Sequence, residues 1–276
     1  MELLNIFNEL SEHVSIQLNS CGEISHPENW IESKQHKDYD LWYIYSGEIQ
    51  IDVQGKSYLA KKGDLVFFNP QIAYRASIIS KSSHFLFTHF DFRLGNQTDI
   101  LNNFTLAGII PHELVPSEIT YYQKAYKQSL QKKPMANIQL KSYLAIIIAK
   151  IIELYATGNY KGEFQPIDTT SNKKMNLPTL QPVFDYIEKH LHQSLRIADL
   201  AECVNMSEKY FIYYFKQAVG ITPGKYMYQL KMNEARKLLY ANLSIAEIAH
   251  LLGYPDQYSF SKAFKKYYKI PPSQFV

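Results

Sequence analysis

A pattern of residues that occurs twice near the C-terminus constrains this chain more than any other feature. Small and apolar residues of the first copy recur 48 residues later, and further matches follow at an offset of 49. The matched pairs are Ile197 and Ile245, Leu200 and Ile248, Ala201 and Ala249, Val204 and Leu252, Phe211 and Phe260, Phe215 and Phe264, Lys216 and Lys265, and Pro223 and Pro272. Such a repeat indicates two copies of one supersecondary unit, with one residue inserted at the second turn.

Each copy predicts two short helices joined by a tight turn. Ser244 opens a capping box at the first helix of the second copy, and Ser207 or Asp256 can cap the second helix of each copy. Asn205 or Gly253 ends the first helix, where a left-handed backbone is needed and these residue types tolerate it. The phenylalanines four residues apart anchor the second helix inward. This is the geometry of a helix-turn-helix, which can place its second helix in a DNA major groove.

The charges on the second copy favour a DNA-reading surface. A helix pair used only for packing explains the apolar positions of both copies, but not the outward face of the second. Between Gln257 and Lys269 there are four cations and no anion, whereas a solvated face more often mixes both signs. Residues 178–276 carry 12 Lys and Arg against 8 Asp and Glu, and the rest of the chain carries 17 against 18. The basic excess therefore lies in the part that would meet a polyanion.

The N-terminal part of the chain has a different period. From residue 40 to 92 apolar and polar residues alternate, and turns such as Ser46-Gly47 and Asn69-Pro70 separate short strands, which predicts an all-β barrel or sandwich. From 116 to 155 the period is helical, with a break near Pro134. Exposed apolar residues of the second helix would either meet another subunit or pack within the chain. Residues 157–178 lack a sustained period and have the composition of a linker.

Composition excludes several classes of protein. The 276 residues include two cysteines, too few for a disulfide framework and in keeping with a reducing compartment. The first residues lack the basic region and cleavage site of a signal peptide. The most apolar run, 14 residues with two charges, is too short to span a bilayer. We expect a cytoplasmic protein with no membrane partner.

The C-terminal hundred residues resemble the DNA-binding domain of the AraC/XylS family of bacterial transcription regulators. The stretches that carry the resemblance are "IAEIAHLLGYPDQYSFSKAFKKYYKIPPSQF", "GITPGKYM" and "LKMNEARKLL". The resemblance implies two recognition helices on one rigid domain, which read successive major-groove segments on the same face of the DNA. The DNA-binding residues that it implies are Lys209, Ile212, Tyr213, Lys216, Gln257, Tyr258, Ser261, Lys262 and Lys265.

Two departures from the family pattern affect these expectations. The first unit has Ile212 and Tyr213 where a polar residue is usual. It offers Lys209 for guanine acceptors, but Ile212 can offer only apolar contact, for instance with a thymine methyl group. We therefore expect the second unit to supply more of the hydrogen-bonded readout. Lys269 stands where the family usually has glycine, which would alter the last turn but not the fold.

The stretch "HKDYDLWYIYSGEIQIDVQGKSYLAKKGDLVFFNPQIAY" resembles the cupin-like sensor barrel of many members of this family. The resemblance implies a pocket for a small molecule, often a sugar, inside the barrel. The candidate ligand-binding residues are His36, Tyr74, Phe87 and His89. Each could equally be an ordinary core or surface residue.

An enzyme reading has to be weighed, because cupins include metal-dependent enzymes. Such chemistry needs several histidine and carboxylate ligands that converge on one ion. His84 and His89 lie five residues apart and so point to opposite faces of a strand. His36 is accompanied by Asp38 rather than by a second histidine, and Tyr74 replaces the usual downstream histidine. We expect no catalytic residues, no metal and no cofactor.

The expected fold class is a multidomain α+β chain: a cupin-like β-barrel with a helical dimerisation segment, followed by an all-α domain with two helix-turn-helix motifs. The expected boundaries are 1–113 for the sensor barrel, 114–157 for the dimerisation segment, 158–178 for the linker and 179–276 for the DNA-binding domain, with its motifs at about 195–219 and 244–268 and a joining helix at about 223–241. The expected function is ligand-responsive, sequence-specific transcription regulation. The expected partners are promoter DNA, a small effector of carbohydrate type and a second copy of the chain, with RNA polymerase as a further candidate. The alternatives are a cupin-type metal enzyme fused to a DNA-binding module, and a regulator whose N-terminal half binds a protein.

Overall fold

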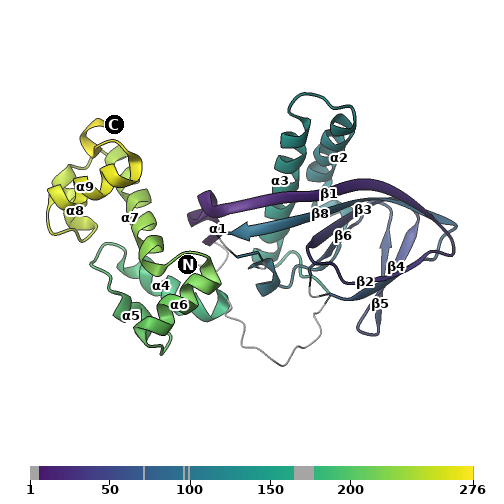
Figure 1. Cartoon of the computed structure of the whole chain (residues 1–276), viewed down its shortest axis with the longest axis horizontal. Coiled ribbons are helices and arrows are strands. Elements are labelled where there is room, and N and C mark those ends of the chain that lie inside the picture. Colours follow the sequence, from purple (N-terminus) through teal and green to yellow (C-terminus); the bar gives the residue numbers. More distant parts are fainter. Residues whose placement is uncertain (1–5, 71, 96, 99, 165–176, 276) are drawn as a thin grey trace. The chain divides into compact units, whose positions relative to one another are not determined.

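The computed structural model describes residues 6–70, 72–95, 97, 98, 100–164 and 177–275 (Figure 1). The chain divides into two compact units. One is rich in β-strands and holds most of residues 12–164. The other is helical and holds residues 177–275, together with residues 6–11 and a short segment at residues 94–97. The β-rich N-terminal part and the helical C-terminal part agree with the fold class predicted from the sequence.

The strands of the first unit form two antiparallel sheets. Their order is β1-β8-β3-β6-β9 in one sheet and β2-β7-β4-β5 in the other. The strands are β1 (Val14–Pro27), β2 (Ile31–Lys34), β3 (Tyr39–Ser46), β4 (Glu48–Val53), β5 (Lys56–Lys61), β6 (Leu65–Phe68), β7 (Tyr74–Ile78), β8 (Ser82–Leu94) and β9 (Gly108–Ile110). The period-two pattern of the sequence is therefore that of strands with one face on a shared core.

A core rich in aromatic side chains connects the two sheets. Trp42 and Phe85 come from the five-stranded sheet, and Ile51, Tyr74 and Ala76 come from the four-stranded sheet; all are buried in one hydrophobic cluster. The Trp42 and Phe85 rings are stacked, with their centroids 4.7 Å apart. This packing fixes the register of the strands, because a slip of one residue would turn these side chains toward solvent.

Two helices cover the other face of the five-stranded sheet, α2 (Pro116–Leu130) and α3 (Ala136–Ala156). The break between them lies around Pro134, as the sequence predicts. The helical period of the sequence places Leu140, Leu144, Ile147, Ile148, Ile151 and Tyr155 on one apolar stripe; all of these are buried except Tyr155, which is half-buried. Ile146 is 47% exposed and Ile138 58% exposed, so part of the apolar surface of α3 has no partner among the described residues.

The segment after α3 extends the barrel core before the described residues stop. Tyr160 donates its hydroxyl hydrogen to the Leu106 carbonyl oxygen, and the Phe164 amide donates to the Ala107 carbonyl oxygen. The Phe164 ring is fully buried against Phe68. Residues 158–164, which the sequence alone assigns to the linker, thus pack on the barrel because two aromatic rings find apolar space there. Most of the predicted linker, residues 165–176, lies outside the described residues.

The helical unit contains both copies of the repeat. Its helices are α4 (Gln181–His190), α5 (Ile197–Glu202), α6 (Glu208–Val219), α7 (Pro223–Tyr240), α8 (Ile245–Leu251) and α9 (Gln257–Tyr268). The remaining short elements are α1 (Ile6–Glu9) and the 3-10 turns at Ser11–His13, Ile100–Asn103, His112–Leu114, Leu177–Leu180 and Pro272–Gln274. Helices α5 and α6 form the first motif, α8 and α9 form the second, and α7 joins them.

Local contacts begin and end these helices as the sequence predicts. The Ser244 hydroxyl accepts from the Glu247 amide and the Glu247 carboxylate accepts from the Ser244 amide, which is the predicted capping box. Ser207 and Asp256 cap α6 and α9. Asn205 and Gly253 both have positive φ, 52° and 69°, at the turn after the first helix of each motif. In the described part of the chain no helix is long and apolar enough to cross a membrane.

Candidate functional site

The second helix-turn-helix presents a basic helix to solvent. Phe260 and Phe264 are fully buried and anchor the inner face of α9 in the core of the helical unit. On its outer side Gln257, Tyr258, Lys262 and Lys265 are exposed and Ser261 is half-buried. The Tyr258 side chain is 78% exposed, which is unusual for an aromatic residue without a ligand. The fold therefore leaves free the side chains that the sequence assigns to base contacts.

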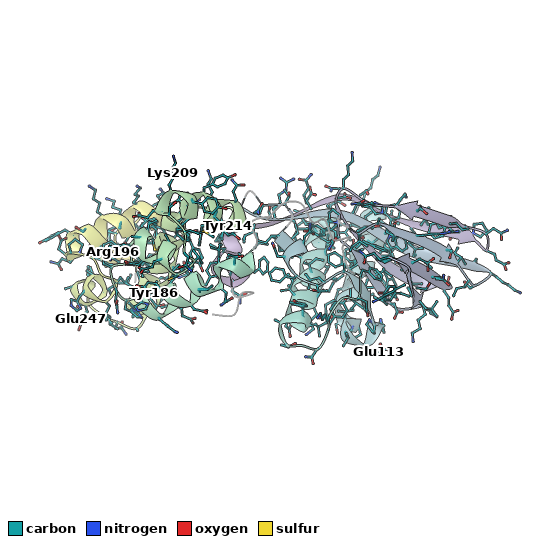
Figure 2. The ribbon with its side chains drawn as sticks, turned by 90° about the horizontal axis from the view of Figure 1, so that it is seen from below. Glu113, Tyr186, Arg196, Lys209, Tyr214 and Glu247 are labelled. Carbon is teal, nitrogen blue, oxygen red and sulfur yellow. The ribbon has the colours of Figure 1, made fainter. Side chains whose placement is uncertain are left out.

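The first motif presents a less polar helix. The outer face of α6 exposes Lys209, Ile212, Tyr213 and Lys216, and Figure 2 shows the Lys209 side chain projecting outward from that helix. Ile212 is 38% exposed and Tyr213 is 54% exposed. Tyr210, which the sequence reading does not select, is also 49% exposed at the start of α6. Half-exposed apolar residues on a helix whose other face is fully buried are available for contact with a groove.

Lys231 of α7 joins the two motifs. Its Nζ atom donates to the Leu252 carbonyl oxygen at 2.6 Å and to the Gln193 carbonyl oxygen at 3.0 Å. Gly253 lies against the same segment, because a Cβ atom there would come within 2.8 Å of the backbone at Gln193 and Ser194. The lysine thus ties the turn of the second motif to the segment that precedes the first. Sequence reasoning missed it because both acceptors are backbone atoms, which leave no residue-type signal.

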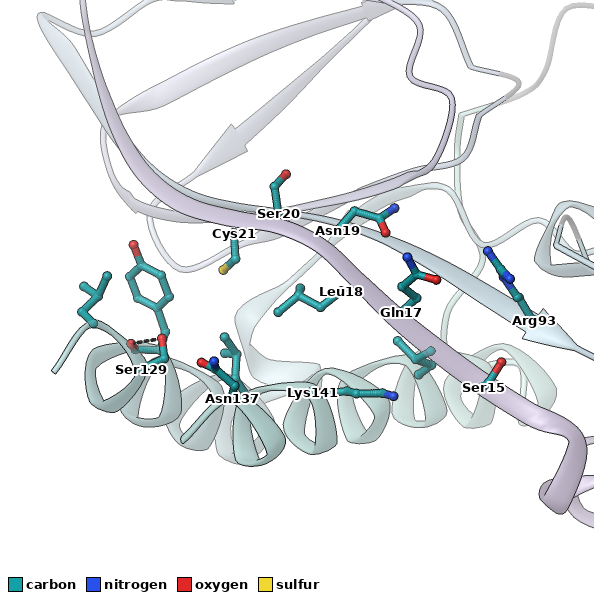
Figure 3. A pocket seen from close by; sticks show the side chains of 14 residues that line it. Ser15, Gln17, Leu18, Asn19, Ser20, Cys21, Arg93, Ser129, Asn137 and Lys141 are labelled. Carbon is teal, nitrogen blue, oxygen red and sulfur yellow. Dashed lines mark hydrogen bonds between the residues drawn. The ribbon is translucent and has the colours of Figure 1, made fainter. Parts of the chain in front are cut away.

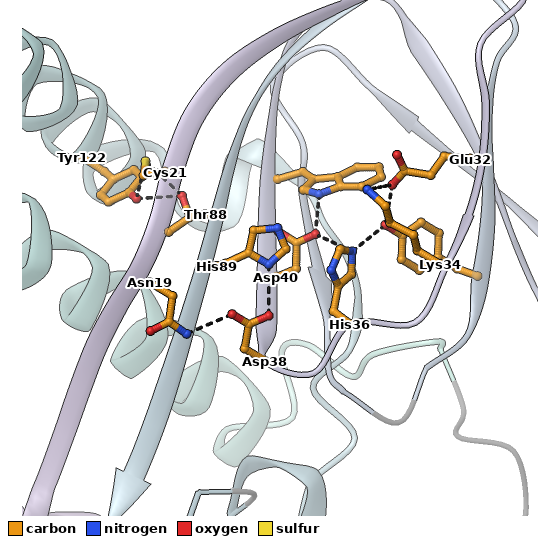
Figure 4. Close-up of polar contacts among 12 residues, drawn as sticks. Asn19, Cys21, Glu32, Lys34, His36, Asp38, Asp40, Thr88, His89 and Tyr122 are labelled. Atoms are coloured by element: carbon orange, nitrogen blue, oxygen red, sulfur yellow. Dashed lines mark hydrogen bonds and ion pairs between the residues drawn. The ribbon is translucent and has the colours of Figure 1, made fainter.

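The sensor unit brings the four predicted ligand residues together, and Figure 4 shows two of them, His36 and His89, side by side. The His36 Nε2 atom lies 2.9 Å from the Tyr74 hydroxyl oxygen, within hydrogen-bond distance. The His36 and His89 rings have centroids 4.6 Å apart, and the Phe87 and His89 centroids are 5.7 Å apart. His36 comes from the loop before β3, Tyr74 from β7, and Phe87 and His89 from β8. Burial lowers the pKa of His36, and the neighbouring His89 adds to this effect.

Asp40 lies at the centre of this group, and the sequence reading missed it. Its side chain is 1% exposed, and its Oδ2 atom accepts a hydrogen bond of 2.7 Å from the Trp42 indole. The Oδ2 atom is also 3.3 Å from His36 Nε2. The Oδ1 atom has no hydrogen-bond partner and lies 3.9 Å from His89 Nε2. Burial raises the pKa of Asp40 to about 7, although His89 and the Trp42 indole lower it.

Strand register explains why these side chains meet. Asp40 on β3 is paired directly with His89 on β8, so both side chains point to the same face of the sheet. The alternate residues of β8 point the other way, and Thr88 lies 2.7 Å from the Tyr122 hydroxyl of α2. His84 stacks on Tyr45 and pairs with Glu23. The prediction that His84 and His89 point to opposite faces is confirmed.

A separate groove of about 680 Å³ runs between β1 and the helix pair α2 and α3 (Figure 3). Its walls carry polar side chains from both sides, among them Asn19, Asn137 and Lys141. Cys21 also lines the groove, and its Sγ atom lies 3.5 Å from the Tyr122 hydroxyl oxygen. Burial raises the pKa of the Cys21 thiol. The groove shares no residue with the four predicted ligand residues.

Comparison with known families identifies both units. The helix-turn-helix domain model matches residues 200–276, and the AraC-like ligand binding domain model matches residues 18–122. The chain therefore contains a helix-turn-helix domain and an AraC-like ligand-binding domain. The two matches fall on the helical unit and on the barrel with its first covering helix.

Named regulators of sugar operons are among the relatives of this chain. It is 31% identical over 111 residues to the raffinose operon transcriptional regulatory protein RafR of Pediococcus pentosaceus, which covers 40% of each chain. It is 23% identical over 266 residues to the lactose operon transcription activator of Staphylococcus xylosus, which covers 95% of this chain and 92% of that one. The first curated relatives are matched over only about 40% of their own length.

One solved structure matches about a third of the chain. The C-terminal domain of AraT, a response regulator from Geobacillus stearothermophilus, is 36% identical, with a TM-score of 0.34, and the match covers 36% of this chain and 83% of that one.

Proposed function

We propose that this chain is an AraC-family transcription regulator that binds promoter DNA through both helix-turn-helix motifs and responds to a small molecule bound in its N-terminal barrel. The observation that carries the proposal is the pair of capped motifs whose second helices, α6 and α9, are anchored by buried phenylalanines and expose the predicted base-reading residues. A helix fixed on its inner side and free on its outer side suits the major groove.

The charges of α9 support the DNA partner. Lys262, Lys265 and Lys266 are exposed, and no acidic residue lies on the helix itself. Lysines of this kind neutralise phosphates, release counterions and so give an affinity that falls steeply with salt. The polar residues Gln257 and Ser261 lie on the same helix and can read base edges, since glutamine pairs with adenine and serine is compatible with several bases.

Selection of DNA sites by the purified full-length protein tests this function. A random double-stranded library should yield an enriched site with two conserved segments about 10 base pairs apart, because two motifs on one face of the DNA are separated by about one helical turn. A double variant, Lys262→Ala with Gln257→Ala, should no longer enrich one of the two segments. Lys124→Ala, on a helix of the sensor unit, serves as the control. If the wild-type protein enriched no common sequence from the random library, the proposal would be overturned.

For the effector we propose a small carbohydrate or a related polyol. The support is the set of donors and acceptors formed by His36, Tyr74 and His89 beside the Phe87 ring, which matches the alternating polar and apolar faces of a sugar. The raffinose and lactose operon regulators named above point to the same class. A thermal-shift screen of mono- and disaccharides tests it: a sugar that raises the melting temperature of the wild-type protein should lose that effect in Phe87→Ala.

A homodimer formed through α2 and α3 completes the proposal. Ile138 and Ile146 of α3 and Tyr121 of α2 are exposed apolar residues on the helix pair. A dimer would bring four helix-turn-helix motifs to two half-sites, which we expect to be direct repeats. RNA polymerase is a further candidate partner at the promoter. Because the DNA partner is chromosomal, the proposed location of the protein is the cytoplasm.

A further inference from the structure

We propose that the sensor unit binds one divalent first-row transition-metal ion, of the kind of Zn²⁺, Fe²⁺ or Co²⁺, through His36, Asp40 and His89. In the described part of the chain these three residues offer ligand atoms that all lie within 4.8 Å of one another. The proposal goes beyond DNA binding and a carbohydrate effector, and it does not depend on either.

The distances suit one ion. Metal bonds to histidine nitrogen and carboxylate oxygen are about 2.0–2.2 Å long, so two ligands of the same ion lie about 3–4 Å apart. The Asp40 carboxylate meets this condition with both histidines: Oδ2 is 3.3 Å from His36 Nε2, and Oδ1 is 3.9 Å from His89 Nε2. Two imidazoles and one carboxylate are a donor set typical of Zn²⁺ and non-haem Fe²⁺.

One oxygen of the Asp40 carboxylate lacks a hydrogen-bond partner. Asp40 is almost fully buried, and its Oδ1 atom has no hydrogen-bond partner. The 3.9 Å to His89 is too long for a hydrogen bond. A buried carboxylate oxygen without a partner is costly, and a bound cation is one of the few ways to compensate it. The unpaired oxygen points to a ligand that the protein atoms alone do not supply.

Residues around the three ligands hold them in the orientation that metal binding needs. The His89 Nδ1 atom lies 3.1 Å from Asp38 Oδ1, and Asp38 Oδ2 accepts from the Asn19 amide at 2.9 Å. A metal-bound histidine almost always donates its other ring N–H to a carboxylate or carbonyl in this way. With Nδ1 as the donor, the lone pair of His89 is on Nε2, which is the atom beside Asp40.

Asp40 is held in the same manner. The Trp42 indole donates to Oδ2 at 2.7 Å, which fixes the plane of the carboxylate. Tyr74 places its hydroxyl oxygen 2.9 Å from His36 Nε2 and 3.3 Å from the Glu32 carboxylate. Figure 4 shows His36, Asp40 and His89 turned toward one another from the loop, from β3 and from β8. The ligands therefore come from separate segments that the barrel core holds in place.

Titration of the full-length protein with Co²⁺ tests the proposal. The protein is prepared without a polyhistidine tag, stripped with a chelator and passed over a desalting column. We expect one Co²⁺ per chain with visible d–d absorption, displaced by one equivalent of Zn²⁺, whereas Mg²⁺ and Ca²⁺, which prefer oxygen ligands, should not compete. Elemental analysis of the Zn²⁺-loaded protein after desalting gives the stoichiometry independently.

Variants locate the ion. His89→Ala and His36→Gln should weaken Co²⁺ binding more than about 100-fold, and Asp38→Asn about 10–100-fold, as is usual for partners of a metal-bound histidine. His84→Ala is the matched control, since His84 lies on the same strand with its side chain on the opposite face. Circular dichroism establishes that each variant is folded. A wild-type protein that binds no Co²⁺, or folded His89 and His36 variants that bind it as tightly as wild type, would overturn the proposal.

Discussion

Single residues at helix ends account for much of the predictability of the helical unit. Lys269 ends α9 with a φ of 68°, in the left-handed region that glycine adopts readily and lysine does not. The equivalent residue of the first motif is Gly220, with a φ of 83°. The sequence pattern marks Lys269 as a departure from the family, which usually has glycine there. In the structure this lysine is a strained residue at the end of α9.

Replacing Lys269 by glycine should therefore stabilise the helical unit by about 1 kcal/mol, because the strain of a left-handed side chain is removed. Thermal unfolding followed by circular dichroism measures the change. Gly220→Ala should act in the opposite direction, since it introduces the same strain in the first motif. Equal melting temperatures for Lys269→Gly and wild type would show that the last turn of α9 relaxes without cost.

The residues of the sensor site divide into those that the sequence could reveal and those that it could not. His36, Tyr74, Phe87 and His89 stand out by residue type, and the structure brings them together from one loop and two strands. Asp40 could not be found in this way, because its importance comes from the register that pairs it with His89, 49 residues away. Period-two patterns specify which face a residue occupies but not which strand lies beside it.

At the scale of helices, α7 connects the two motifs, and its Lys231 links the turn of the second motif to the segment before the first. The Lys231 side chain is half-buried, and burial lowers the pKa of its ammonium group. It nonetheless donates to carbonyl oxygens on both sides, and its Nζ atom lies 5.8 Å from the centroid of the Tyr254 ring. The local signals of the sequence predicted each helix pair, but this tertiary link could not be predicted.

Lys231→Met should keep the packing of the stem and remove both hydrogen bonds. We expect a loss of about 2 kcal/mol, typical of a charge-assisted hydrogen bond, because the part-buried bond to the Leu252 carbonyl oxygen is lost. Guanidinium denaturation of the full chain, followed at the transition of the helical unit, measures it. Lys225→Met, an exposed change on the same helix, should alter stability by less than about 0.5 kcal/mol. If the two variants are equally stable, the lysine is not a structural link.

The two recognition helices should contribute differently to sequence reading. On α9, Gln257→Ala and Lys262→Ala remove hydrogen-bonding groups and should each relax preference at one or two base positions, at a cost of about 1–3 kcal/mol. On α6, Lys209→Ala should weaken all sites more evenly. Competition binding with single-base variants of the selected site separates the two effects. Loss of sequence preference in the α6 variant alone would reverse this assignment.

At the scale of the molecule, composition and period predicted a β-rich part followed by a helical part, and this is confirmed. The end of the sensor unit was not predictable, because Tyr160 and Phe164 occur in a polar stretch whose composition is that of a linker. Their burial depends on apolar space left by strands far away in the sequence. The period of α3 likewise identifies its buried stripe but cannot say what would cover Ile138 and Ile146.

If α2 and α3 form the dimer interface, a charge at its centre should separate the subunits. Ile146→Glu is expected to weaken self-association at least about 10-fold, because it buries a carboxylate without a partner. Analytical ultracentrifugation over a range of concentrations measures the change. Lys141→Glu is the matched control, since it lies five residues earlier and so about 140° around the same helix. Equal dissociation constants for the two variants would exclude this face as the interface.

Strand β8 is a wall shared by two compartments. Its odd-numbered side chains, Phe87 and His89, face the barrel site, and the intervening Thr88 bonds to Tyr122 of α2. Neighbouring residues of a strand are joined by rigid peptide units, so a backbone displacement at His89 would also displace Thr88. A backbone shift at the barrel site would therefore reach the helix pair on the far side of the sheet through Thr88, the residue next to His89.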